Sequence, residues 1–228
     1  MRLAPLFLFA AAALFLRPAH GQAEQNTDDE LKVYAVNVVK NTPFEKPFTG
    51  DGIYLGDGAV ITAFHVIGRW GFLKNPHVLI AGQNLPATIV KAGSVDTIDL
   101  MLLSVPEQTL PVSLLLRRNP LCRQPPFVGE PVIDVTSKLT TRHQVVSPLF
   151  IAPQDRKRYS TLIDRPENSG SGVFDAEKRC LLGIVSLALT KFDYRTVAGQ
   201  LVAKPSGEVG YFVPASQIAA FLPKEYRY

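Results

Sequence analysis

The chain has 228 residues, of which 46% are hydrophobic and only 19% are charged, and its formal net charge is +4. This composition supports a sizeable buried core and excludes an intrinsically disordered protein. The sequence has no dense stripe of lysine and arginine, so nucleic acid is not an expected partner.

The amino terminus predicts a secretory signal peptide over residues 1–23. Arg2 supplies the positive charge, residues 3–16 form an apolar stretch, and small residues follow it. As a helix the apolar stretch would be about 21 Å long, which is short of the roughly 30 Å hydrocarbon core of a bilayer. An uncleaved anchor is the alternative. We expect export to the periplasm or the extracellular space, with no membrane span once the signal is removed.

Short apolar or alternating runs separated by turn residues begin at residue 31, which is typical of β-strands. In the first half we expect strands over residues 33–39, 52–55, 59–62, 78–81, 87–92 and 100–105. The next stretch, residues 117–126, is rich in proline and lacks apolar periodicity, so it predicts a linker.

Further strands are expected in the second half, and a short helix ends the chain. The strands cover residues 131–135, 143–146, 160–163, 173–174, 181–189 and 210–213, and apolar residues at helical spacing follow over residues 214–222. Many short strands with almost no helix indicate an all-β barrel or sandwich. The linker divides the chain into segments 31–116 and 127–223, each near the usual domain size, and two small barrels that meet at a cleft fit this pattern.

Cys122 and Cys180 are the only cysteines. Because an exported protein meets oxidising conditions, a single disulfide between them is plausible, and two separate buried thiols are the alternative. Neither cysteine has neighbours at metal-ligand spacing, so no metal site and no cofactor are expected.

Three segments each place one reactive side chain at the edge of an apolar run. They are residues 61–66 with His65, residues 99–103 with Asp99, and residues 167–173 with Ser169. A hydroxyl is a poor nucleophile at neutral pH, so it needs a base within hydrogen-bond reach and a third group to orient that base. Each residue alone has an ordinary structural explanation, and two neighbours compete with the choice: Asp96 for the carboxylate and Ser171 for the hydroxyl.

Together these segments resemble the trypsin/chymotrypsin-like serine proteases, especially bacterial secreted forms. The similarity lies in Thr-Ala-Phe-His-Val at residues 62–66, Asp-Leu-Met-Leu-Leu at 99–103, Asn-Ser-Gly-Ser at 168–171, Gly-Ile-Val-Ser at 183–186 and Gly-Tyr-Phe-Val-Pro at 210–214. The motifs occur in the family's order over nearly the whole chain after residue 31. The resemblance implies two six-stranded antiparallel β-barrels with the active site in the cleft between them, a short C-terminal helix, and an endopeptidase that acts on peptides or proteins.

The resemblance also implies a role for each residue. His65 is the general base and later the acid, Asp99 orients it, and Ser169 is the nucleophile because Val173 begins a strand four residues later, as in the family. The N–H groups of Ser169 and Glu167 would form the oxyanion hole. The residues that would bind substrate are Ile163, Ser186, Leu187, Ala188, Gly210 and Phe212.

Glu167 departs from the family, in which this position is almost always glycine. Glycine lets the backbone turn its N–H into the oxyanion hole, and a glutamate can resist that conformation. The sequence therefore leaves two functions open: an active secreted endopeptidase, or a weak or inactive protease-like protein that binds peptides in the same cleft. Hydrolysis of small esters or amides is a third hypothesis. If Ile163 is the base of the specificity pocket, we expect a preference for a small or medium apolar residue before the cut.

Overall fold

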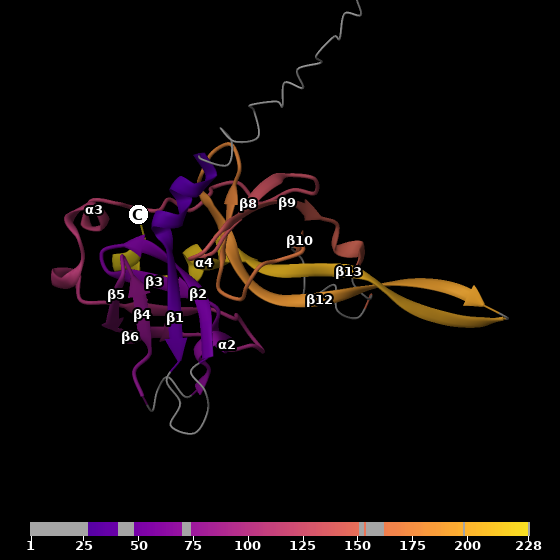
Figure 1. The fold of residues 1–228 in the computed structure, drawn as a ribbon, viewed down its shortest axis with the longest axis horizontal. Helices are drawn as coiled ribbons and strands as arrows, with labels where there is room; N and C mark the ends of the chain where they lie inside the picture. The colour runs from indigo at the N-terminus through magenta and orange to yellow at the C-terminus, as the bar shows by residue number, and fades with distance from the viewer. Residues whose placement is uncertain are drawn as a thin grey trace, which may run out of the picture.

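The computed structural model describes residues 27–40, 48–69, 74–150, 153, 162–197 and 199–227, and these residues form mainly β-structure in two sheets (Figure 1). The predicted signal peptide lies outside the described residues. Over the ranges just given, no helix combines the length and the apolar character that a bilayer crossing requires.

The first sheet has seven antiparallel strands in the order β5-β4-β1-β2-β3-β7-β6. Their bounds are β1 Ala35–Lys40, β2 Phe48–Gly56, β3 Ala59–Thr62, β4 His77–Ile80, β5 Gln83–Pro86, β6 Thr88–Ala92 and β7 Met101–Ser104. The end strands β5 and β6 are joined by a single residue, Ala87, so the two ends of the sheet meet at that corner. A hairpin needs a loop of at least two residues, so β5 and β6 do not pair with each other. The expected closed six-stranded barrel is therefore found only in part in this half, which is a seven-stranded sheet whose two ends meet.

The second sheet is a closed barrel of six strands in the order β10-β13-β12-β11-β8-β9, as the resemblance implied for this half. Their bounds are β8 Pro131–Val135, β9 Thr140–Val146, β10 Leu162–Asp164, β11 Gly172–Asp175, β12 Leu181–Val197 and β13 Gln200–Pro214. The strands β12 and β13 are much longer than the sequence predicts. Their distal parts leave the barrel as a two-stranded ribbon, which Figure 1 shows reaching away from the body.

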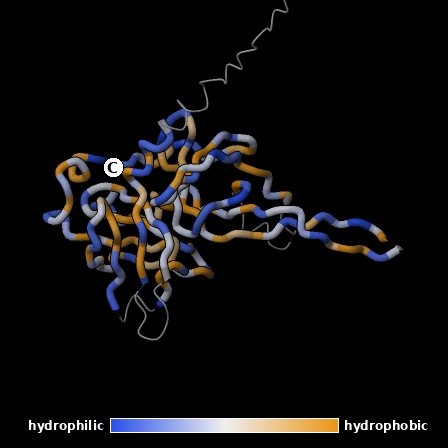
Figure 2. The backbone as a smooth tube through the Cα atoms, viewed as in Figure 1, coloured by the Kyte–Doolittle hydropathy of each residue, from blue (hydrophilic) through white to orange (hydrophobic). Residues whose placement is uncertain are grey.

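A single cluster of buried side chains lies between the two sheets. The first sheet contributes side chains such as Ile53, Ile61 and Leu102, and the second contributes side chains such as Phe174 and Ile184. Burying these apolar side chains between the sheets is favourable, and the shared core therefore holds the two sheets together. Hydrophobic residues accordingly gather inside the body (Figure 2).

The predicted linker makes specific contacts with both sheets. The Asn119 N–H donates to the Leu55 carbonyl of β2 at 3.0 Å, and the Cys122 N–H donates to the Leu181 carbonyl of β12 at 2.9 Å. A disulfide joins Cys122 to Cys180 with 58 residues of separation. The segment is therefore fastened to the second sheet covalently as well as by hydrogen bonds.

The remaining helices are short, and one of them was expected. Helix α4, Ala215–Phe221, directly follows β13, and its Ile218 and Phe221 enter the shared core, which confirms the predicted C-terminal helix. The other short helices are α2 Phe64–Ile67, α3 Val112–Leu115, and the 3₁₀ turns η1 Glu30–Tyr34, η3 Glu107–Thr109, η4 Pro148–Phe150 and η5 Lys224–Tyr226.

We predict that replacing both cysteines with alanine lowers the free energy of unfolding by about 4 kcal/mol, because the closed loop restricts the unfolded chain. Urea unfolding of the oxidised protein and of the Cys122→Ala/Cys180→Ala variant measures this difference. A reducing agent should bring the wild-type protein down to the stability of the variant. Equal stability of the variant and the oxidised protein would show that the bridge contributes nothing.

Candidate active site

Strand pairing brings His65 and Asp99 together. His65 lies in α2, immediately after β3, and Asp99 lies two residues before β7 begins. Strands β3 and β7 are antiparallel neighbours, with Thr62 opposite Met101. The end of β3 and the start of β7 are therefore adjacent, and both side chains project from the same end of the strand pair.

The two side chains form a close pair. His65 Nδ1 lies 2.7 Å from Asp99 Oδ2, and the His65 backbone N–H donates to Asp99 Oδ1 at 3.0 Å. An ionised carboxylate only accepts hydrogen bonds, so Nδ1 carries the proton and Nε2 is left free to act as a base. The competing carboxylate, Asp96, is exposed, whereas Asp99 is buried.

A third group, the Ser186 hydroxyl, donates to Asp99 Oδ2. Burial by itself raises the pKa of Asp99, but the hydrogen bonds from His65 and Ser186 and the attraction of His65 outweigh it, so this pKa is lowered from its usual value. Asp99 is therefore an ionised, fixed partner for the imidazole.

Ser169 lies on the loop between β10 and β11. Gly170 has φ +86°, and a Cβ there would lie 1.9 Å from the Asp51 carbonyl oxygen, so only glycine fits after the serine. The Ser169 carbonyl accepts from the Asp51 N–H at 3.0 Å, which ties this loop to β2. Ser169 is half-buried, while the competing Ser171 is fully buried, so the structure favours Ser169 as the accessible hydroxyl.

Hydrogen bonds connect Ser169, through Ser186, to the pair formed by His65 and Asp99. The Ser169 hydroxyl donates to the Ser186 carbonyl at 3.1 Å, and the Ser186 hydroxyl in turn donates to Asp99. Ser186 occupies a bulge between Val185 and Leu187 in β12. The chain Ser169–Ser186–Asp99–His65 thus crosses from the second sheet to the first.

The resemblance assigns two N–H groups to the oxyanion hole, and one of them, that of Glu167, bonds another group in the structure. The Glu167 N–H donates to Asp134 Oδ2 of β8 at 2.8 Å, so it is not free to bind an oxyanion in this conformation. The Glu167 side chain is exposed, and its Oε1 accepts from the Thr141 hydroxyl at 2.8 Å. At this position the backbone N–H bonds the buried Asp134, while the carboxylate lies at the surface.

Asp134 is a completely buried carboxyl group with little compensation. Burial raises its pKa to about 7, and the Ser171 hydroxyl and the Glu167 N–H, which lower it, offset this only in part. The charges of Glu167 and Asp51 raise it further. No sequence motif pointed to Asp134, although an aspartate inside the apolar run 132–135 was a signal for it.

The predicted specificity pocket is closed. Ile163 and Phe212 are fully buried in the core of the second barrel, and Ile163 pairs with Gly210 across β10 and β13. A Cβ on Gly210 would lie 2.5 Å from the Pro166 ring, so this ring lies directly against the expected pocket wall. Leu187 and Ala188 follow Ser186 along β12, the first half-buried and the second exposed.

No protein-family model and no curated protein sequence matches the chain. Solved structures do match it. The active form of the Rv3671c protease from M. tuberculosis is similar with a TM-score of 0.58 at 18% identity, over 96% of this chain and 93% of that one. The fold is that of a trypsin-like serine protease.

Two further structures with this fold agree. The serine endoprotease from Yersinia pestis has a TM-score of 0.56 at 19% identity, over 87% of this chain and 64% of that one. Kallikrein-related peptidase 10 has a TM-score of 0.53 at 16% identity, over 86% of this chain and 95% of that one. At these identities the likeness extends to the trypsin-like fold and no further.

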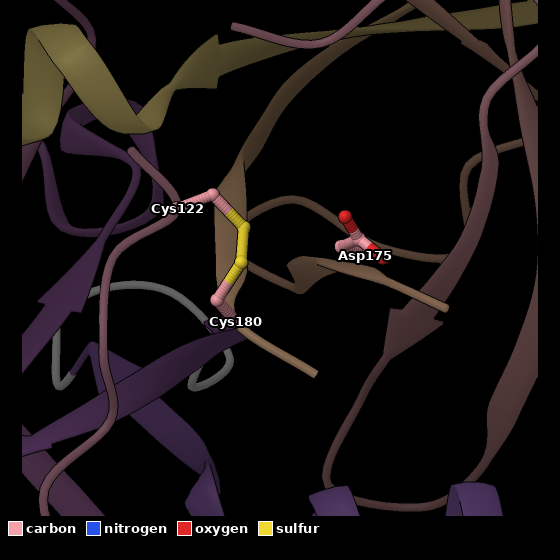
Figure 3. A group of neighbouring side chains, drawn as sticks. All are labelled: Cys122, Asp175 and Cys180. Carbon is pink, nitrogen blue, oxygen red and sulfur yellow. A yellow bond between two sulfur atoms is a disulfide. The ribbon is translucent and has the colours of Figure 1, made fainter. Parts of the chain in front are cut away.

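One group of side chains is close enough to share a metal ion, within the part of the chain that the structure describes: Cys122, Asp175 and Cys180 (Figure 3). The two sulfur atoms are bonded to each other, so neither is a thiolate ligand. The Asp175 carboxylate accepts from the N–H groups of Glu177 and Lys178 and pairs with the Lys178 ammonium at 2.7 Å. The group is therefore a disulfide beside a lysine–aspartate ion pair.

We predict that Asp134→Asn changes how the free energy of unfolding depends on pH. The pKa of Asp134 is raised in the folded state, so the folded protein holds this proton where the unfolded chain releases it. The stabilisation is complete below about pH 4 and is lost as pH rises to about 7. Relative to the wild type, the variant should therefore gain a few kcal/mol between pH 4 and pH 8.

Urea unfolding gives the free energy of unfolding of both proteins at several pH values. Groups that titrate alike in both proteins contribute equally to the two values, so their difference reports the residue at position 134. A constant difference across the pH range would contradict the raised pKa of Asp134.

Proposed function

We propose that the chain is an exported serine endopeptidase that hydrolyses peptide bonds through His65, Asp99 and Ser169. The observation that carries the proposal is the hydrogen-bonded chain from Ser169 through Ser186 to the buried Asp99–His65 pair. A buried carboxylate that fixes an imidazole, beside an accessible serine on a tightly held loop, is the arrangement that activates a hydroxyl.

In this mechanism the Ser169 oxygen attacks the peptide carbonyl while His65 Nε2 accepts the hydroxyl proton. The imidazolium that forms is stabilised by the ionised Asp99 at 2.7 Å. His65 then gives the proton to the leaving amine, which breaks the peptide bond and leaves an acyl group on Ser169. Water, activated by the same histidine, hydrolyses this ester and restores the enzyme.

The tetrahedral intermediate carries a negative oxygen that needs two N–H donors. We assign this role to Ser169 and Glu167, and the Glu167 N–H must first leave Asp134. Peptide binding along residues 186–188 would displace the Ser169 hydroxyl from the Ser186 carbonyl and start this rearrangement. We further propose that Ile163 forms the base of the specificity pocket when the pocket opens, which favours small or medium apolar residues before the cut.

A second function is favoured by the closed geometry. The bond from the Glu167 N–H to Asp134 and the contact of Pro166 with Gly210 would suit a weak or inactive relative that binds peptides in the same cleft. The two proposals differ in whether Ser169 can form a covalent bond.

We predict that a fluorophosphonate probe labels the wild-type protein on Ser169. Labelling should fall to background in Ser169→Ala and by at least about 10³-fold in His65→Ala, since the hydroxyl then lacks its base. Ser171→Ala is the matched control and should keep most of the labelling. Mass spectrometry of the labelled peptide identifies the residue, and a protein that stays unlabelled would favour the binding function.

We predict that Glu167→Gly raises the labelling rate by up to about 10²-fold, because glycine frees the backbone to turn its N–H into the hole. Glu167→Gln, which removes the charge but keeps the side chain, should change the rate little because the carboxylate is exposed and bonded to Thr141. Equal increases in both variants would place the obstruction in the charge instead of the backbone.

A further inference from the structure

The distal parts of β12 and β13, residues 190–197 and 200–208, form a projecting ribbon that we call the arm (Figure 1). It begins after the pair Leu189–Val209 and continues to the pair Val197–Gln200. A two-stranded ribbon is marginally stable in water, and a third strand or a packing partner is usually needed to stabilise it. In Figure 2 the arm carries both hydrophobic and hydrophilic residues far from the core.

The arm is amphipathic across its two faces. Residues directly opposite each other in an antiparallel ladder share a face. One face therefore carries three successive cross-strand pairs: Phe192 with Pro205, Tyr194 with Ala203, and Thr196 with Leu201. On this face Phe192 is 46%, Tyr194 62% and Leu201 71% exposed. The opposite face carries Asp193, Lys204, Arg195 and Gln200, together with Val197 and Val202.

One edge of the arm leads directly to the nucleophile. Strand β11 pairs with β12 as far as Ile184, and Val185 is held by hydrogen bonds to Gly170 and Ser171. From Ser186 to Val197, no strand of the described residues pairs with this edge of β12. The other edge, on β13, is taken by β10 at residues 209–211, so a strand added there would be stopped before the site.

We propose that the edge of β12 along the arm is an exosite for the substrate, and that it binds an extended polypeptide as an added antiparallel strand on the amino side of the cut. The inference rests on the proposed function, because Ser186 is where that function places the peptide bond. In an antiparallel pairing, substrate residues that lie successively before the cut meet residues successively farther along β12.

The arm also indicates which polypeptides fit. A third strand would set every second substrate side chain on the face of Phe192 and Tyr194, where apolar side chains would cover exposed rings. The edge from Ser186 to Val197 is long enough for about ten extended residues. The expected substrate is an unfolded or extended chain with alternating apolar residues before the cut.

The affinity of the Ser169→Ala protein for peptides tests the exosite, because this variant cannot cleave what it binds. The probe is a fluorescent peptide of about 14 residues with valine at alternate positions, and a short peptide of about four residues serves as the comparison. Fluorescence anisotropy should show that Phe192→Ser/Tyr194→Ser weakens binding of the long peptide by about tenfold or more, and leaves the short peptide unchanged. Replacing residues 190–208 by an Asn-Gly turn should have the same effect.

The matched control is Val197→Ser/Val202→Ser, which removes two apolar side chains from the opposite face and should leave affinity unchanged.

Fluorophosphonate labelling of the same arm variants with Ser169 restored reports the proposed function separately. Unchanged labelling with lost long-peptide binding supports the exosite. If the wild type is also unlabelled, the catalytic proposal is overturned, and the long-peptide affinities still decide whether the arm binds a polypeptide. Equal affinity of the turn variant and the parent for the long peptide would overturn the exosite. A loss of dimers in the turn variant with unchanged affinity would assign the arm to self-association.

Discussion

The site depends on one buried carboxylate, Asp99, that both sheets compensate. Burying an ionised carboxylate is costly unless hydrogen bonds replace its water shell. Asp99 receives the N–H and Nδ1–H of His65 from the first sheet, and the hydroxyl of Ser186 from the second. The shared apolar core holds the two sheets so that these donors converge. Compensating this charge therefore also fixes the imidazole and places Ser186, which accepts from the Ser169 hydroxyl, against Asp99.

A second buried carboxyl group, Asp134, has the opposite balance. The pKa of Asp99 is lowered because its donors outweigh burial, whereas the pKa of Asp134 is raised to about 7 because its donors do not. One of those few donors is the Glu167 N–H. The bond that partly compensates Asp134 is thus the same bond that withholds a donor from the proposed oxyanion hole. Releasing the Glu167 N–H would leave Asp134 protonated or less compensated, which gives the present conformation a physical cause.

Much of the fold was predictable from local pattern. Strands β3 and β8 match the predicted residues 59–62 and 131–135, because apolar runs bounded by turn residues define them. The arm was not predictable in this way. It contains no continuous apolar run, because exposed side chains such as Phe192 and Tyr194 alternate with charged residues. Strand β5 was also missed, since three of its four residues are exposed.

The residues of the candidate site could be named from the sequence, because each lies in a motif with a reactive side chain. His65, Asp99 and Ser169 lie at the ends of apolar runs; the structure pairs His65 with Asp99 directly and links Ser169 to that pair through Ser186. The orientation of the Glu167 N–H was not predictable, because it depends on a long-range contact with Asp134 of β8. The closure of the pocket likewise depends on how Pro166 lies against Gly210, which no local pattern reveals.

The structure of the protein with a phosphonate bonded to Ser169 would show whether the Glu167 N–H can leave Asp134 and bind an oxyanion, because the bound group mimics the tetrahedral intermediate. We predict a phosphonyl oxygen within hydrogen-bond distance of the Ser169 and Glu167 N–H groups, with the Glu167 N–H released from Asp134. An adduct in which the Glu167 N–H still donates to Asp134, or a failure of Ser169 to form the adduct, would contradict the account.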